Sequence, residues 1–204
     1  MSFVSVENLK DETKFEKLAD IKINEIVNFV SQYYYKNFSV VIATHYFISF
    51  LTLAVWLWSG WQTDALDALL ASLGWGILSF LLLLPLHEWI HGVTYQMFGA
   101  KDVRYKFELR KMVAYAVAHN FVANRREFIW VALMPSLVIN FLLLIIAIVF
   151  PEIRLIAFAA LLFHIGGTSG DFALLNFLWV HRDREVYTYD DADAQLSYFY
   201  ATRK

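Results

Sequence analysis

Five consecutive residues, His87-Glu88-Trp89-Ile90-His91, offer the clearest chemistry in the sequence. Histidines four residues apart on a helix project from the same face, so both imidazoles can bind one metal ion. The intervening glutamate then lies where it can take a proton from metal-bound water. Two histidines and one carboxylate are typical zinc ligands and leave a fourth position open, as catalytic sites require. The pattern predicts a hydrolytic zinc (Zn²⁺) site with His87 and His91 as ligands and Glu88 as catalytic base. The alternative is a polar patch at a helix end.

A third zinc ligand must come from elsewhere in the chain, and Asp171 is the best candidate. His87 lies twenty residues past Asp67, and Asp171 lies seventeen past Arg154, on two apolar segments predicted to run in the same direction. At a rise of ~1.5 Å per residue, the two side chains lie at similar depths, about 30 and 25 Å from the segment starts. A lone aspartate in an apolar helix is costly unless it is paired, hydrated or bound to a metal. The alternative for Asp171 is a buried carboxylate hydrogen-bonded to a neighbouring side chain.

Other histidines compete for roles at this site. His164 lies two helical turns before Asp171, shares its face and is the competing third ligand. His119 is a weaker candidate ligand and a candidate stabiliser of a developing oxyanion. His45 is expected to be a hydrogen-bonded interior residue. The sequence has no cysteine, so any metal must be bound by histidine and carboxylate groups.

The apolar residues are concentrated in four long stretches. The chain is 59% hydrophobic with a mean hydropathy of +0.48, which exceeds the usual balance of soluble domains. Runs of this length are typical of transmembrane helices, and they cover Phe38–Trp61, Asp67–Phe98, Phe128–Phe150 and Leu155–Val180. Residues 103–118 alternate apolar and polar side chains, which predicts a β-hairpin around Arg110-Lys111. We therefore expect an all-α polytopic membrane protein with four transmembrane helices and a cytoplasmic-side β-hairpin between the second and third.

The segments outside the predicted spans are more polar. Residues 1–37 show no cleavable signal peptide, and apolar residues at three- and four-residue steps from Lys14 to Tyr35 predict an amphipathic helix. That helix would lie at the membrane surface or pack on the protein's own cytosolic face. The expected parts are a cytoplasmic N-terminal amphipathic segment (1–37), a four-helix transmembrane metalloprotease-like domain (38–180) and a cytoplasmic tail (181–204) with a short strand near Leu196–Tyr200.

Positive charge is distributed unevenly between the two sides of the predicted helices. Sixteen of the seventeen lysine and arginine residues fall on the side of both termini and the hairpin, and Arg154 alone lies on the opposite side. The positive-inside rule makes the basic side cytoplasmic, so both termini are expected in the cytoplasm. A net charge of −2 does not indicate a nucleic-acid partner. The expected partners are the lipid bilayer and a membrane protein or peptide substrate.

The order of these features resembles a bacterial family of small membrane proteins described as putative zincin peptidases. The resemblance extends from about Leu66 to Val180 and rests on HEWIH at the cytoplasmic end of a span, a hairpin, a proline-containing span and then GGTSGD. That family is similar to the site-2 protease group of intramembrane metalloproteases. The resemblance implies a bacterial cytoplasmic membrane, zinc bound by His87, His91 and Asp171, and Glu88 as the base. The chain departs from the site-2 pattern because Gly170-Asp171-Phe172 replaces Leu-Asp-Gly and no PDZ-like domain is inserted, which leaves the substrate class open.

Three functions are compatible with these residues. The first is a membrane-embedded zinc metallopeptidase acting on membrane or juxtamembrane substrates, with the hairpin either binding an extended substrate by β-addition or serving as a cytosolic cap. The second is a non-catalytic membrane metal-binding protein, such as a sensor, an accessory protein or an inactive relative. A metal-dependent lipid oxidase ranks last, because such sites usually need more clustered ligands.

Overall fold

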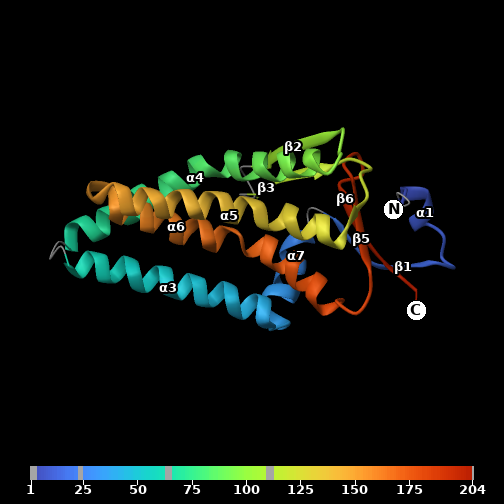
Figure 1. Cartoon of the computed structure of the whole chain (residues 1–204), viewed down its shortest axis with the longest axis horizontal. Coiled ribbons are helices and arrows are strands. Elements are labelled where there is room, and N and C mark those ends of the chain that lie inside the picture. The colour runs from blue at the N-terminus through green and yellow to red at the C-terminus, as the bar shows by residue number, and fades with distance from the viewer. Residues whose placement is uncertain (1–3, 23–24, 63–65, 109–112, 204) are drawn as a thin grey trace.

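The computed structural model describes residues 4–22, 25–62, 66–108 and 113–203. In these residues the fold is elongated: long helices form one half, and a β-sheet near both termini forms the other (Figure 1). The long helices are α3 (Val40–Gln62), α4 (Leu66–Met97), α5 (Arg125–Val149), α6 (Arg154–Gly167) and α7 (Ser169–Val180). Shorter helical segments are α1 (Val6–Leu9), α2 (Ile26–Val30), the π-helix η2 (Ser31–Lys36) and the 3₁₀ helix η4 (Pro151–Ile153).

Three of the described helices, α3, α4 and α5, are long and apolar enough to cross a membrane. A fourth crossing results if η4–α6 and α7, which are bent by 45° at a short break, count as one span. Large apolar side chains are exposed along these helices, as expected for surfaces that are solvated by lipid. The structure therefore has three or four candidate spans where the sequence predicts four.

The helices pack closely through small residues. A Cβ atom at Gly76 of α4 would lie 2.6 Å from the Cβ of Ala159 on α6, so the two backbones approach more closely than larger side chains would allow. α5 begins at a capping box: the Asn124 side chain accepts hydrogen bonds from the N–H groups of Arg126 and Glu127, and the Glu127 carboxylate accepts one from the N–H of Asn124. The glycine thus allows close packing of α4 on α6, and the capping box defines where α5 begins.

The expectation of an all-α fold is too narrow, because the described residues include a four-stranded antiparallel sheet. Its strand order is β1-β6-β5-β4. The strands are β1 (Phe15–Lys22), β4 (Ala123–Asn124), β5 (Val186–Asp191) and β6 (Leu196–Thr202). The C-terminal segment thus contributes two strands, where the sequence indicated a polar tail with one short strand. β1 pairs with β6, so segments near the two ends of the chain form one sheet.

The predicted amphipathic helix over Lys14–Tyr35 is wrong in its first half, which forms β1. The pairing of β1 with β6 shifts register between Lys17 and Ala19. Such a bulge inserts one extra residue and interrupts the alternation of a strand. The less exposed residues of β1 therefore do not alternate strictly: they are Phe15, Leu18, Ala19 and Ile21. The helical part of this segment is confined to α2 and η2.

A separate two-stranded sheet lies between α4 and α5. β2 (Val103–Glu108) and β3 (Val113–Ala118) pair antiparallel, with Val103 opposite Ala118 and Tyr105 opposite Ala116. These strands occupy the segment where alternating side chains predict a hairpin. The predicted turn at Arg110-Lys111 lies outside the described residues. β3 lies against α4, so the hairpin covers the helix that carries HEWIH.

The four-stranded sheet packs on the end of the helix bundle through aromatic side chains. Phe199 of β6 is fully buried and contacts Phe177 of α7 and Phe128 of α5, with ring centroids 4.9 and 5.9 Å apart. Phe29 of α2 joins the same cluster, 5.7 Å from the ring of Phe177. The N-terminal helices and the sheet therefore share one apolar core with α5 and α7.

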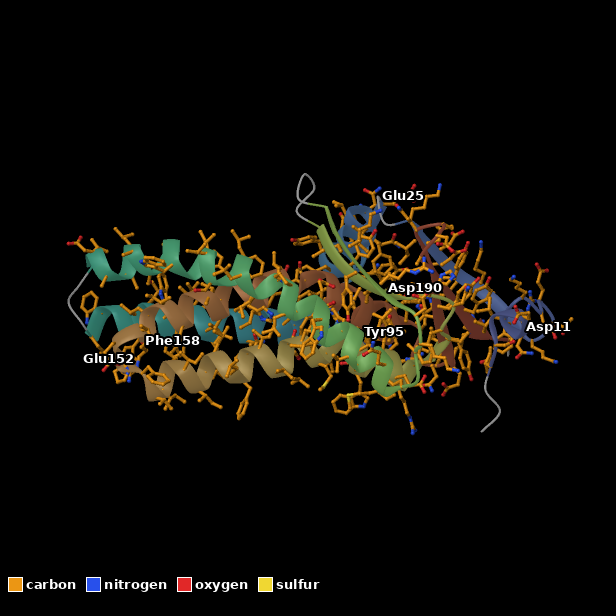
Figure 2. The ribbon with its side chains drawn as sticks, turned by 90° about the horizontal axis from the view of Figure 1, so that it is seen from above. Asp11, Glu25, Tyr95, Glu152, Phe158 and Asp190 are labelled. Atoms are coloured by element: carbon orange, nitrogen blue, oxygen red, sulfur yellow. The ribbon has the colours of Figure 1, made fainter. Side chains whose placement is uncertain are left out.

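A buried carboxylate connects the sheet to both α4 and the hairpin. Asp190 of β5 accepts hydrogen bonds from Ser197 Oγ at 2.6 Å, from the N–H of Ala118 at 3.2 Å and from the hydroxyl of Tyr95 on α4. Tyr95 and Asp190 are labelled in Figure 2, where α4 meets the strands. Burial raises the pKa of Asp190 to about 6, although its three hydrogen bonds act in the opposite direction.

The raised pKa of Asp190 predicts a specific pH dependence of stability. Between about pH 4 and pH 6 the folded protein holds a proton that the unfolded chain has released, so the free energy of unfolding falls as the pH rises through this window. The fall from this group is at most about 3 kcal/mol and is complete above pH 6. Asp190→Asn should lack this component in unfolding curves measured between pH 4 and 7.

Asp67→Asn is the matched control for this measurement, because Asp67 is an exposed aspartate at the start of α4. It should keep the wild-type pH dependence. An Asp190→Asn variant with the same pH dependence as wild type would contradict the assignment.

Candidate metal centre

The HEWIH segment lies within the continuous helix α4, and its helical geometry sorts the five side chains between two faces. His87 and His91 are buried on the inner face, with their Nε2 atoms 3.1 Å apart. Trp89 points outward and is 55% exposed. The two imidazoles therefore converge, as histidines at positions i and i+4 of a helix should.

Asp171, in the first turn of α7, brings a carboxylate to the same point. Its Oδ2 lies 3.3 Å from Nε2 of His87, and its Oδ1 lies 3.3 Å from Nε2 of His91. Asp171 reaches this position because the last span breaks at Thr168, between α6 and α7. The structure thus brings together the three residues that the sequence singled out as metal ligands.

The break next to Asp171 is stabilised from α3. His45 is fully buried, and its Nε2 donates to the carbonyl oxygen of Ile165 at 2.9 Å and lies 3.2 Å from Thr168 Oγ1. The other ring nitrogen, Nδ1, pairs with the hydroxyl of Tyr34 at 2.5 Å. His45 therefore satisfies a backbone carbonyl at the interruption, which would be costly to leave unpaired in an apolar interior. The prediction that His45 is a hydrogen-bonded interior residue is confirmed.

When both imidazoles are neutral, their outer hydrogen bonds leave the two converging nitrogens without protons. Nδ1 of His91 donates to the carbonyl oxygen of Val131 at 2.8 Å, so a neutral His91 carries its lone pair on Nε2. Nδ1 of His87 is engaged with His164 at 3.1 Å, which leaves Nε2 of His87 facing His91 and Asp171. The inner face of the cluster is then made of acceptors alone.

The dimensions of the cluster fit a zinc ion. A tetrahedral zinc with bonds of about 2.0–2.1 Å separates its ligand atoms by roughly 3.3 Å. The two Nε2 atoms are 3.1 Å apart, and each lies 3.3 Å from a different oxygen of Asp171, so the carboxylate faces the pair with both of its oxygens. His87, Glu88 and His91 also form a buried group whose ligand atoms lie within 4.8 Å of one another and could hold a metal ion.

Glu88 lies between this cluster and the hairpin. Its carboxylate is buried and accepts a hydrogen bond from the backbone N–H of Ala116 on β3. A cavity of about 190 Å³ adjoins Glu88, His91 and Asp171, and extends along β3 towards Asp190 and the sheet. Its lining is mainly apolar. A substrate group in this cavity would lie next to both the carboxylate of Glu88 and the proposed ligands.

The family model described as "Putative zincin peptidase" matches residues 80–185 of the chain. The chain belongs to this family. The matched region begins before HEWIH and ends after α7, so it contains the hairpin, the break at Thr168 and Asp171. No curated protein and no solved structure matches the chain. The similarity of this zincin peptidase family to site-2 proteases stays a prediction.

Two further histidines, His164 and His119, are candidates for this site from the sequence. His164 lies behind His87, on the side of the ring away from Asp171, because its Nε2 faces Nδ1 of His87. His119 lies in a different place: its Nδ1 accepts from the N–H of Ala192, and its Nε2 faces Asn120. His119 is grouped with Asp191 and Asp193 near the sheet and is not among the residues that line the cavity. The structure therefore does not support His119 as the oxyanion stabiliser.

Sequence reasoning missed a contact that brings the hairpin to the site. The hydroxyl end of the Tyr105 side chain, from β2, lies against Gly92, one residue after His91; a Cβ atom at Gly92 would clash with the hydroxyl and lie 2.6 Å from Cζ. Gly92 lies four residues after Glu88, so Tyr105 covers the same face of α4 as the catalytic candidate. The glycine in HEWIHG was the available signal, because a helical glycine often marks a close approach.

The contact between Gly92 and Tyr105 predicts an asymmetric response to alanine substitution in α4. Gly92→Ala should push the Tyr105 side chain aside and disturb the seating of the hairpin, lowering the thermal unfolding temperature and disturbing the candidate metal centre. Gly74→Ala in the same helix is the control, because a Cβ atom there meets no atom within 4 Å. It should leave the unfolding temperature unchanged or raise it, since alanine favours a helix. Equal effects of the two substitutions would argue against a hairpin seated on Gly92.

Proposed function

We propose that this chain is a membrane-embedded zinc metallopeptidase that hydrolyses peptide bonds of membrane or juxtamembrane substrates. The observation that carries the proposal is the convergence of two imidazoles from α4 and one carboxylate from α7 beside Glu88. Membership of the "Putative zincin peptidase" family supports the same chemistry. His87, His91 and Asp171 would bind the metal, and Glu88 would be the catalytic base.

The roles follow from the position of each group. Bound zinc would supply a Lewis acid that lowers the pKa of its water and polarises the substrate carbonyl. Glu88 takes the proton of the attacking water and later delivers it to the leaving amine nitrogen. The N–H of Ala116 holds the carboxylate of Glu88 beside the cavity. The apolar lining excludes bulk water, which strengthens the electrostatic interactions within the site.

The outer edge of β3 is suited to hold an extended substrate. The N–H groups of Ala116 and Ala118 point away from β2, towards Glu88 and Asp190 respectively. Among the described residues, β3 forms a ladder only with β2, so this edge borders the cavity without a partner strand. A transmembrane helix must become extended before its peptide bonds can be attacked, and pairing with an exposed strand edge provides that conformation.

We also propose a bacterial cytoplasmic membrane location with both termini in the cytoplasm. The distribution of lysine and arginine supports this orientation. The metal site then lies in the cytoplasmic half of the membrane, because HEWIH is near the end of α4 that approaches the hairpin and the sheet. The proposed partners are the bilayer and a membrane protein or peptide that supplies the scissile bond.

The decisive test of the base is Glu88→Gln, which keeps the shape of the side chain and removes its basicity. The purified full-length variant should retain one equivalent of zinc. It should lose about 10²- to 10⁴-fold in cleavage of single-span peptides reconstituted in lipid nanodiscs, with fragments identified by mass spectrometry. Undiminished cleavage by this variant would exclude the mechanism. Zinc binding without cleavage in the wild type would favour a non-catalytic metal-binding protein.

Asp171→Ala tests the third ligand. Elemental analysis should find one equivalent of zinc in the wild type and strongly reduced zinc in the variant, since two histidines alone bind the ion weakly. Asp67→Ala is the matched control, because Asp67 is an exposed aspartate at the start of α4. It should retain the full equivalent. An Asp171→Ala protein with full zinc content would remove Asp171 from the ligand set.

A further inference from the structure

We infer that His164 and Asn140 form a buried relay that fixes the tautomer and orientation of His87, and that they are positioning residues and not ligands. The inference rests on the metal site of the proposed function. It concerns three different helices, because His87 is on α4, Asn140 on α5 and His164 on α6. The relay consists of two hydrogen bonds that end at the metal-facing imidazole.

The geometry of the relay is well defined. Nδ1 of His87 and Nε2 of His164 are 3.1 Å apart, and Nδ1 of His164 lies 2.7 Å from Oδ1 of Asn140. His164 is fully buried, at 1% exposure, in an interior formed by α4, α5 and α6. A buried imidazole is costly unless it is hydrogen-bonded. Both ring nitrogens of His164 have a partner here, Nε2 in His87 and Nδ1 in the half-buried Asn140.

The hydrogen bonds determine which nitrogen carries each proton. Oδ1 of Asn140 can only accept, so Nδ1 of His164 is the donor and Nε2 of a neutral His164 carries a lone pair. That lone pair accepts from Nδ1–H of His87. Nε2 of His87 is then the unprotonated nitrogen, and it points at His91 and Asp171. The side-chain oxygen of Asn140 on α5 thereby determines, through His164, that Nε2 of His87 on α4 carries a lone pair.

The same geometry argues against His164 as a ligand. Its Nε2 is directed at the outer nitrogen of His87, so the ring of His87 stands between His164 and the cluster. His91 shows the simpler arrangement, in which a backbone carbonyl, that of Val131, accepts from Nδ1. An imidazole that serves as acceptor can rotate about its Cβ–Cγ bond or change tautomer, and would then no longer present a lone pair to His87. A backbone carbonyl has no such freedom. The hydrogen bond from His164 to Asn140 removes this freedom from His164.

The test is zinc affinity, measured on the purified full-length protein in nanodiscs by competition with a chromophoric chelator. His164→Phe keeps a ring and removes the acceptor, and it should weaken zinc binding about 10- to 100-fold, the usual effect of losing such a partner. His164→Gln offers an amide oxygen to His87 and should recover most of that loss. Asn140→Leu should also weaken zinc binding, by a smaller factor. His164 remains in this variant, but no hydrogen bond fixes its ring orientation or tautomer.

Ser136→Ala provides a control in the same helix as Asn140, one turn earlier. Ser136 is buried, and its hydroxyl has no hydrogen-bond partner among the described residues. This variant should bind zinc like the wild type. The visible absorption of Co²⁺ in place of zinc gives a second readout: His164→Phe should alter the spectrum through the changed orientation of His87, and His164→Gln should restore it.

The possible results separate the relay from the metal site itself. If the wild type binds no zinc, the proposed function fails and the relay fails with it. If the wild type binds zinc and His164→Phe binds it equally tightly, the relay is overturned while the metal site stands. If both His164 variants fold, as judged by thermal unfolding, and Gln is no better than Phe, the hydrogen-bond role is wrong. If neither His164 variant folds, the zinc affinities of Asn140→Leu and Ser136→Ala are compared instead. Equal affinities of these two variants would overturn the inference.

Discussion

The Nε2 atoms of His87 and His91 and the carboxylate of Asp171 meet within 3.1 to 3.3 Å in the interior of an apolar helix bundle. Lone pairs in such proximity repel one another and are poorly solvated, so the arrangement needs positive charge between them, supplied by a metal ion or by protons on the imidazoles, and neighbours that keep each group in place. The surrounding structure keeps each of the three groups in place. His45 satisfies a carbonyl at the break that precedes Asp171, Val131 holds His91, and His164 faces the outer side of His87. The proposed metal ion would supply the positive charge between them.

The sheet and the helix bundle meet on α4, one turn beyond the second histidine of HEWIH. Tyr95 donates to Asp190 of β5, and Asp190 also accepts from the N–H of Ala118 on β3. The sheet therefore does not merely cover the end of the bundle. It holds α4 and the hairpin in one arrangement, which is why strands from both ends of the chain matter to a site formed by α4 and α7.

Much of the site could be predicted from the sequence, because its main signals are local. Histidines at i and i+4 identify their helix face, and an aspartate in an apolar helix at matching depth identifies its partner. The sequence indicated a short strand within β6, but β1 was not predicted, because its bulge interrupts the alternation that identifies a strand. The positions of His119 and His164 depend on how distant segments pack, which spacing along one chain does not specify. Tyr105 was missed for the same reason, although Gly92 marked the point of contact.

In the proposed function, the hairpin would connect substrate binding to the base Glu88. Alternate N–H groups on the outer edge of β3 are taken by two carboxylates, that of Ala116 by Glu88 and that of Ala118 by Asp190. Carboxylates here replace the carbonyls of a neighbouring strand, which prevents an unsatisfied edge in a low-dielectric environment. If an extended substrate binds along this edge, it must use the remaining backbone groups and pass directly beside Glu88. The strand that would hold the scissile bond is then the same strand that holds the carboxylate, so a displacement of β3 would move both together.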